Sequence, residues 1–185
     1  MDLQALGLEL LSVREQSRGR PVVDQEAFAR RQEILATFAP LARVYRLNGE
    51  ARGAATLDWM IGSGMEPVKS FLGPHVRSVV PEYQIDRWRV DRAAFHEGGR
   101  ASLIEVKDGG SPRDAVAGIG QVLFYKAALE RTSSFAPIVP ALAVLAEHDV
   151  DLARACSLAG VEYLPLGDVK WMRTLSEFVA LTVCG

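Results

Sequence analysis

From His75 onward the chain alternates short segments rich in Val, Ile, Tyr and Trp with segments of helical periodicity, and this alternation constrains the fold more than any other feature. In order, the pattern predicts strands at 76–80, 83–90 and 101–107, a helix at 114–130, a strand at 138–146, a helix at 151–159, a strand at 161–164 and a helix at 170–182. The segment from His96 to Arg100 supplies a turn, so the strands flanking it are expected to form an antiparallel hairpin. The order predicts an α/β fold.

The residues before His75 predict helices. Residues 24–38 begin with Asp24 as a candidate N-cap, and Pro40 is expected to end or kink this helix. A weaker helical stretch covers residues 53–61. No internal repeat or low-complexity tract divides the chain. We therefore expect a single domain over 1–185, with an N-terminal helical extension at 1–50 and a core at 51–185.

The composition excludes several classes of protein. The 185 residues include 21 basic and 23 acidic ones, a net charge of −2, so any binding to nucleic acid must be local rather than driven by bulk charge. Cys156 and Cys184 are too few for a four-cysteine iron–sulfur site and are predicted to be free thiols. The three histidines are scattered and match no zinc pattern. No apolar run is long enough to cross a membrane, and the first residues lack the positively charged segment of a secretory signal peptide. Both features favour a cytoplasmic location.

Each arm of a predicted hairpin carries a carboxylate within an apolar strand, Asp86 in one arm and Glu105 in the other. Burying such a charge is unfavourable unless a cation or a hydrogen-bonding partner compensates, so a bound metal ion would explain both acids. Because side chains alternate along a strand, Glu105 and Lys107 share one face while Val106 points to the core. If Asp86 lies opposite, two carboxylates and one ammonium meet at one place, which suits a divalent cation and an attacking water. The hypothesis requires these three groups to meet.

The helix that follows carries a polar pair, Gln121 and Tyr125, one turn apart on the same face. Alone, this pair could simply cap a helix–sheet interface, but the neighbouring acids favour a functional role. Gly118 and Gly120 lack the third glycine of a dinucleotide-binding pattern and are expected to permit close helix packing. For Trp88 the sequence leaves two roles undecided, packing in the core and contact with the substrate.

Asp86, the triplet Glu105-Val106-Lys107 and the pair Gln121 and Tyr125 together resemble the PD-(D/E)XK nuclease superfamily, with the Q-x-x-x-Y element of its exonuclease branch. The resemblance covers residues 76–165 and implies the restriction-endonuclease-like fold, a mixed β-sheet flanked by helices. Ile85 stands where the family has its proline. The family's first-helix acid has three candidates here and stays unassigned: Glu33, Asp58 and Glu66.

The resemblance implies a Mg²⁺-dependent deoxyribonuclease, a phosphodiester hydrolase in which Mn²⁺ can substitute for Mg²⁺. Asp86 and Glu105 would bind the metal with help from the Val106 carbonyl, and Lys107 would position or activate the water. Gln121 would orient phosphate or water, and Tyr125 would support it. DNA is the implied partner, a homodimer or larger protein assembly is a further expectation, and no membrane partner is expected. Five basic residues are candidates for holding the phosphate backbone: Arg87, Arg89, Arg92, Arg113 and Lys126.

Three other interpretations stay open from sequence. Glu105 and Lys107 could form a surface ion pair on an edge strand. The fold could have lost its chemistry and bind DNA or a protein in a phage, defence or repair assembly. The chain could instead be an α/β protein with an unrelated small-molecule site, which predicts that Asp86 and Glu105 lie apart. The sequence does not distinguish DNA from RNA, or internal cleavage from cleavage at ends.

Overall fold

A computed structural model describes residues 5–9, 25–66, 68–109, 111–167 and 174. The chain divides into two compact units, one formed by Met1–Leu47 with Asp168–Gly185 and the other by Asn48–Gly167. The predicted helix at 170–182, the N-cap Asp24 and Cys184 lie outside the described residues. The division into an extension at 1–50 and a core at 51–185 stays a prediction.

The described part of the first unit consists mainly of one long helix, α2 (Gln25–Tyr45). Pro40 lies inside this helix, so of the two predicted effects, an end or a kink, the end is wrong and the kink stays a prediction. Proline removes one backbone hydrogen bond, but Phe38 and Leu41 on either side of it are fully buried. Their packing favours continuation of the helix.

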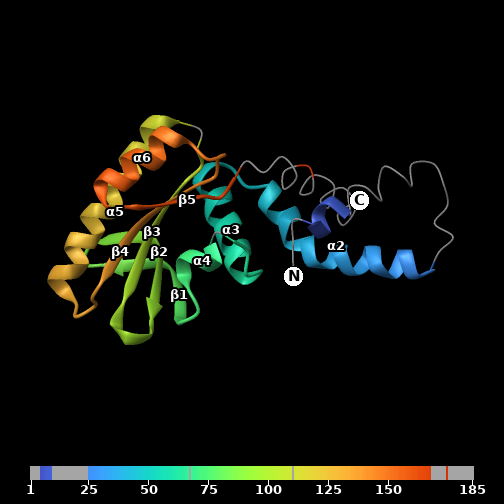
Figure 1. Ribbon diagram of the computed structural model, residues 1–185, viewed down its shortest axis with the longest axis horizontal. Coiled ribbons are helices and arrows are strands. Elements are labelled where there is room, and N and C mark those ends of the chain that lie inside the picture. Colours follow the sequence, from blue (N-terminus) through green and yellow to red (C-terminus); the bar gives the residue numbers. More distant parts are fainter. Residues whose placement is uncertain (1–4, 10–24, 67, 110, 168–173, 175–185) are drawn as a thin grey trace. The chain divides into compact units, whose positions relative to one another are not determined.

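The second unit is built on a five-stranded sheet in the order β1-β2-β3-β4-β5. Its strands are β1 (Val76–Ile85), β2 (Trp88–His96), β3 (Ala101–Lys107), β4 (Ile138–Val144) and β5 (Glu162–Pro165). The first three strands are antiparallel to one another, and β3, β4 and β5 are parallel. Figure 1 shows α5 (Pro112–Thr132) and α6 (Val150–Ala159) on one side of this sheet, and α3 (Gly49–Gly62) and α4 (Val68–Leu72) on the other. The predicted α/β class, a mixed sheet flanked by helices, is confirmed.

Strand β3 is the central strand, and all seven of its residues are buried. Its side chains alternate between the two helical layers, as predicted. A Cβ added at Gly53 of α3 would come within 2.8 Å of Val106, whereas one added at Gly118 of α5 would come within 3.2 Å of the Lys107 stem. Gly118 therefore allows α5 to lie close over Lys107, which confirms its predicted packing role. Gly120 faces open space, so the same prediction is wrong for that residue.

The strand boundaries differ from the prediction at the start of the sheet. Strand β1 runs continuously to Ile85 through Pro81, which an edge strand tolerates. The chain then turns at Asp86 and Arg87, where Asp86 has a φ of 54°. Aspartate is one of the few residues besides glycine that adopt this left-handed region without a large penalty. The turn therefore falls inside the segment predicted as a single strand at 83–90.

The described elements after β3 lie close to their predicted bounds, whereas α4 was not predicted and α3 begins at Gly49 rather than at Gly53. Asp149 caps α6 by accepting hydrogen bonds from the backbone of Asp151 and Leu152, and Gly160 closes the helix in the left-handed conformation with a φ of 67°. Cys156 is a buried free thiol, as predicted. Within the described residues, no helix combines the length and apolar character that crossing a membrane requires.

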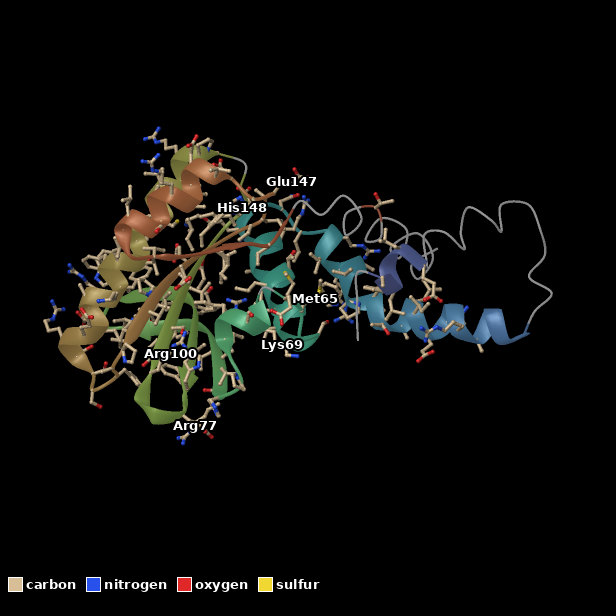
Figure 2. The ribbon with its side chains drawn as sticks, viewed as in Figure 1. Met65, Lys69, Arg77, Arg100, Glu147 and His148 are labelled. Carbon is tan, nitrogen blue, oxygen red and sulfur yellow. The ribbon has the colours of Figure 1, made fainter. Side chains whose placement is uncertain are left out.

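The parallel strands β3 and β4 end at the same edge of the sheet. In Figure 2, Glu147 and His148, which follow β4, mark this edge, and Arg100, which precedes β3, lies toward the opposite edge. Lys107 is the last residue of β3. The charged residues of β3 therefore lie near the carboxyl edge, where open α/β sheets generally place their sites.

Candidate active site

Glu105 and Lys107 form a buried ion pair in β3. The Lys107 ammonium donates to Glu105 Oε1 at 2.9 Å, and the two residues are only 4% and 6% exposed. Because β3 is an interior strand, the interpretation of this pair as a surface ion pair on an edge strand is wrong. The predicted placement of both side chains on one face is confirmed.

Asp91 of β2 is the aspartate that reaches this pair. Its Oδ2 accepts a hydrogen bond of 2.7 Å from the Val106 backbone N–H. Arg92 pairs with Ile104 in the β2–β3 ladder, so one step further along the hairpin Asp91 faces Glu105. The sequence contained a signal for this, since Asp91 and Glu105 each lie seven residues from Gly98 in the predicted turn.

Asp91, Glu105 and Lys107 are called the acid cluster below. Asp86 does not reach this cluster, and its predicted convergence with Glu105 and Lys107 is wrong. It sits in the β1–β2 turn with an exposed side chain. Asp91 already lies three residues, or about 10 Å, along β2 from Trp88, and Asp86 lies beyond that strand end. The separation of Asp86 from Glu105 matches what an unrelated small-molecule site would give, but Asp91 provides a second carboxylate where one was expected.

Glu50, in the first turn of α3, is the helical acid of the cluster. Its Oε1 accepts a hydrogen bond of 3.1 Å from the Lys107 ammonium. The three sequence candidates for this role have other partners: Glu33 pairs with Arg30, Asp58 pairs with Arg92, and a Glu66 carboxylate oxygen accepts from the Ser70 backbone. Glu50 was missed because the helix was predicted to begin at Gly53 rather than at Gly49.

Burial and mutual repulsion perturb the acids of this cluster. Burial, reinforced by the nearby Asp91 charge, raises the pKa of Glu105 to about 7. Burial also raises the pKa of Asp91, although its hydrogen bond from Val106 opposes the shift. Burial disfavours the charged form of Lys107, but its hydrogen bonds and charge interactions with Glu105 and Glu50 outweigh this and raise its pKa. Lys107 is therefore an ammonium at neutral pH.

One oxygen of Glu105 has no partner. Oε2 is buried and accepts no hydrogen bond from the residues that the structure describes. A buried oxygen of this kind, on an acid paired closely with a second acid, is a fit for a cation ligand. The described residues contain no group of three or more His, Cys, Asp or Glu side chains arranged to hold a metal ion. Mg²⁺ usually binds through one or two carboxylates and keeps several waters, so Asp91 and Glu105 fit this ion.

Gln121 and Tyr125 share one face of α5, as predicted, and line a common pocket of about 410 Å³. The other lining residues are Trp88, Ala117, Gly120 and Phe124. Tyr125 is buried and close enough to Glu105 and Asp91 for their charges, after burial itself, to raise the pKa of its hydroxyl. Gln121 is exposed on the pocket side. The pocket therefore adjoins the acid cluster through Tyr125.

The five candidate phosphate-binding residues fall into different environments. Arg92 is buried and forms two hydrogen bonds with Asp58 of α3, at 2.7 and 2.6 Å, so its predicted contact with a phosphate backbone is wrong. Lys126 pairs with Glu130, and Arg89 lies 3.5 Å from Glu82. Arg87 lies over the Trp88 ring, and Arg113 is exposed at the start of α5.

Comparison with known proteins gives little beyond this geometry. No protein-family model matches the chain, and no curated protein matches it. Among solved structures, the chain is similar to the crystal structure of a repair endonuclease from Pyrococcus abyssi, with a TM-score of 0.44 and 15% sequence identity. The match covers 58% of this chain and 45% of the endonuclease chain. The function is therefore inferred from this chain's own residues.

Proposed function

We propose that the protein is a Mg²⁺-dependent nuclease that hydrolyses phosphodiester bonds of DNA. One observation carries the proposal: Glu105 is buried with an unpartnered oxygen, beside Asp91 on the next strand and Lys107 on its own. The residues Asp91 and Glu105-Val106-Lys107 keep the resemblance to the PD-(D/E)XK superfamily, with Asp91 in place of Asp86. Val90 then stands where the family has its proline.

In this proposal Asp91 and Glu105 hold the metal, assisted by the Val106 carbonyl. The chemistry that Mg²⁺ supplies when bound is neutralisation of charge on the phosphate and a lower pKa of the attacking water. Because its raised pKa keeps Lys107 protonated, its ammonium donates hydrogen bonds and does not act as the base. It positions the water and stabilises negative charge on the phosphate. Glu50 holds this ammonium in place, and Gln121 and Tyr125 orient the groups that enter from the pocket.

Cleavage assays with matched variants test the proposal. Purified protein is incubated with linear, circular, single-stranded and branched DNA in Mg²⁺, in Mn²⁺ and in EDTA. We expect cleavage with either metal, none in EDTA, and loss of cleavage in Glu105→Gln and Lys107→Ala proteins that remain folded by circular dichroism. Leu158→Ala, an exposed change on α6, serves as the control. Undiminished cleavage by Lys107→Ala would contradict the proposed role of the ammonium.

A second candidate is a catalytically inactive module of the same fold that binds DNA or a protein partner. The observation that favours it is the double pairing of Lys107, whose ammonium is held by both Glu50 and Glu105. An ammonium satisfied in this way stabilises the buried Glu105 carboxylate without any metal, while the exposed Glu50 holds it from the other side. Calorimetric titration with Mg²⁺ and Mn²⁺ separates the candidates. Absence of metal binding together with retained DNA binding would support the inactive module.

A further inference from the structure

Two exposed aromatic side chains meet beside the acid cluster. Trp88 is 40% exposed and Phe124 is 48% exposed, and they are the aromatic members of the exposed large hydrophobic residues in the described part of the chain. Their ring centroids are 5.2 Å apart with an interplanar angle of 78°. One comes from the tip of the β1–β2 hairpin and the other from α5, so the contact joins two elements far apart in sequence.

These rings form the wall of the pocket that also contains Gln121 and Tyr125. Its volume of about 410 Å³ lies in the range of roughly 300–1,000 Å³ that is typical of small-molecule sites. A planar ring can stack on Trp88 or Phe124, and the Gln121 amide can both donate and accept a hydrogen bond. Tyr125 lines this pocket and is also close enough to Glu105 and Asp91 for their charges to raise the pKa of its hydroxyl.

Two positive charges flank the aromatic wall. The Arg87 guanidinium lies 5.2 Å from the centre of the Trp88 ring. Arg113 precedes Ala117 by one helical turn on the α5 face that carries Gly120, Gln121 and Phe124. The exposed acids nearest in sequence, Asp86 and Asp114, each adjoin one of these arginines and weaken the local field without cancelling its fork-shaped donors. The arrangement suits an occupant that is planar and aromatic at its centre and anionic on both sides.

We propose that this pocket binds one unpaired base of single-stranded DNA, stacked on Trp88 or Phe124, with the flanking phosphates at Arg87 and Arg113. The inference rests on the proposed function and deepens it, because it names the form of DNA that the site takes. A base in a duplex must leave its stack and its partner before it can enter such a pocket, whereas an unpaired base enters without that cost. Unpaired segments are therefore the preferred substrate.

Binding measured without cleavage tests this proposal. A fluorescein-labelled oligothymidylate is titrated with protein in Ca²⁺ or EDTA, and fluorescence anisotropy gives its Kd. A duplex of the same length and a strand of the same length with abasic sites serve as competitors. We expect the single strand to compete best and the abasic strand to compete poorly, since it keeps the phosphates and lacks the stacking rings.

Two variants change the pocket in opposite ways. Trp88→Ala removes a stacking surface, and Gly120→Leu fills the pocket from a position where an added Cβ meets nothing within 4 Å. We expect each to weaken single-strand binding by about 5- to 150-fold, the range measured for loss of one base–aromatic stack. Duplex binding should change less than about twofold. Leu158→Ala, which removes an exposed apolar side chain on α6, should leave both Kd values unchanged.

The possible results distinguish this inference from the proposed function. Failure of the wild-type protein to bind the single strand, or equal Kd values for wild type, Trp88→Ala and Gly120→Leu, would overturn the pocket inference even if DNA is cleaved. Single-strand binding that both variants weaken, in a protein that cleaves nothing in Mg²⁺, would support the pocket and remove the nuclease. Equal competition by the thymidine and abasic strands would show that phosphate contacts alone account for binding and would overturn the pocket inference.

Discussion

Glu105 has one carboxylate oxygen bonded to Lys107 and another without a partner, and both lie out of reach of solvent. Lys107 stabilises the charged form of Glu105, whereas burial and repulsion from Asp91 and Glu50 destabilise it. The destabilising effects are larger, so the pKa of Glu105 rises to about 7. Two states relieve the conflict. The carboxyl can take up a proton, or the carboxylate can bind a divalent cation together with Asp91. The two states compete, which makes metal binding and protonation mutually exclusive at this residue.

This competition predicts an unusual pH dependence of stability for the metal-free protein. The pKa of Glu105 is raised from 4.5 to about 7, so the folded state holds a proton that the unfolded state has released between these values. The proton held by Glu105 stabilises the folded state fully below pH 4.5. This stabilisation is lost as the pH rises to 7, so the free energy of unfolding falls by about 3 kcal/mol for the full shift. In EDTA, urea denaturation at pH 5 and pH 8 should show this loss in wild type and not in Glu105→Gln. Parallel pH profiles for the two proteins would rule it out.

The two aspartates of the β1–β2 hairpin provide a second test at single residues. Asp91→Asn keeps the side chain's size but removes a carboxylate that faces Glu105, so we expect cleavage in Mg²⁺ to fall by at least about 100-fold. Asp86→Asn changes an exposed turn residue in the same hairpin and should retain most of the activity. Initial rates on the same single-stranded substrate measure both. The reverse order of effects would restore Asp86 as the metal ligand.

Among the elements, α5 contributes to the site through its shape as well as its side chains. A Cβ at Gly118 would lie 2.6 Å from Leu142 Cδ1 and 3.2 Å from the Lys107 stem, while one at Gly120 would meet nothing within 4 Å. Alanine favours a helix over glycine by about 1 kcal/mol at both positions. Gly120→Ala should therefore stabilise the protein by up to about 1 kcal/mol. Gly118→Ala should destabilise it by roughly 1–3 kcal/mol, because of overpacking, and should slow cleavage by displacing Lys107.

Urea denaturation curves and cleavage rates of these two glycine variants provide the measurement. Each variant is the control for the other, since the same substitution is made two residues apart on one helix. Equal stability changes at Gly118 and Gly120 would show that α5 moves away from β3 easily. The close approach of this helix would then have no part in holding Lys107.

The elements also show what the sequence could predict. Strand β3 has its predicted bounds, because an apolar run of this length between two turns fixes a buried strand. The site's second acid was misplaced because the turn at Asp86 and Arg87 lacks the usual Asn-Gly or Asp-Gly pair, and the chain around it is rich in strand-forming residues. Glu50 was missed because glycines weaken the start of α3 in sequence, while Leu57 and Met60, which are buried, stabilise that helix through packing that periodicity alone does not reveal.

For the molecule as a whole, the net charge of −2 sets how it can attract DNA. A chain with slightly more acids than bases gains nothing from long-range attraction to a polyanion. Three of the basic residues near the site are also committed to acids: Arg92 is paired with Asp58, Lys107 with two acids, and Lys126 with Glu130. Attraction must then come from a few local contacts, together with stacking, which salt does not screen.

The salt dependence of binding should reflect this distribution of charge. If Arg87 and Arg113 are the two residues that neutralise phosphates, the slope of log K against log salt for a single strand is about −1.4, since each phosphate contributes about −0.7. Anisotropy titrations between 50 and 300 mM NaCl, in Ca²⁺, measure this slope, with Arg87→Gln expected to reduce its magnitude by about half. A wild-type slope of about −4 or steeper would mean that several further basic residues contact the strand. Binding would then depend on a broad basic surface, and the stacking pocket would be a minor contributor.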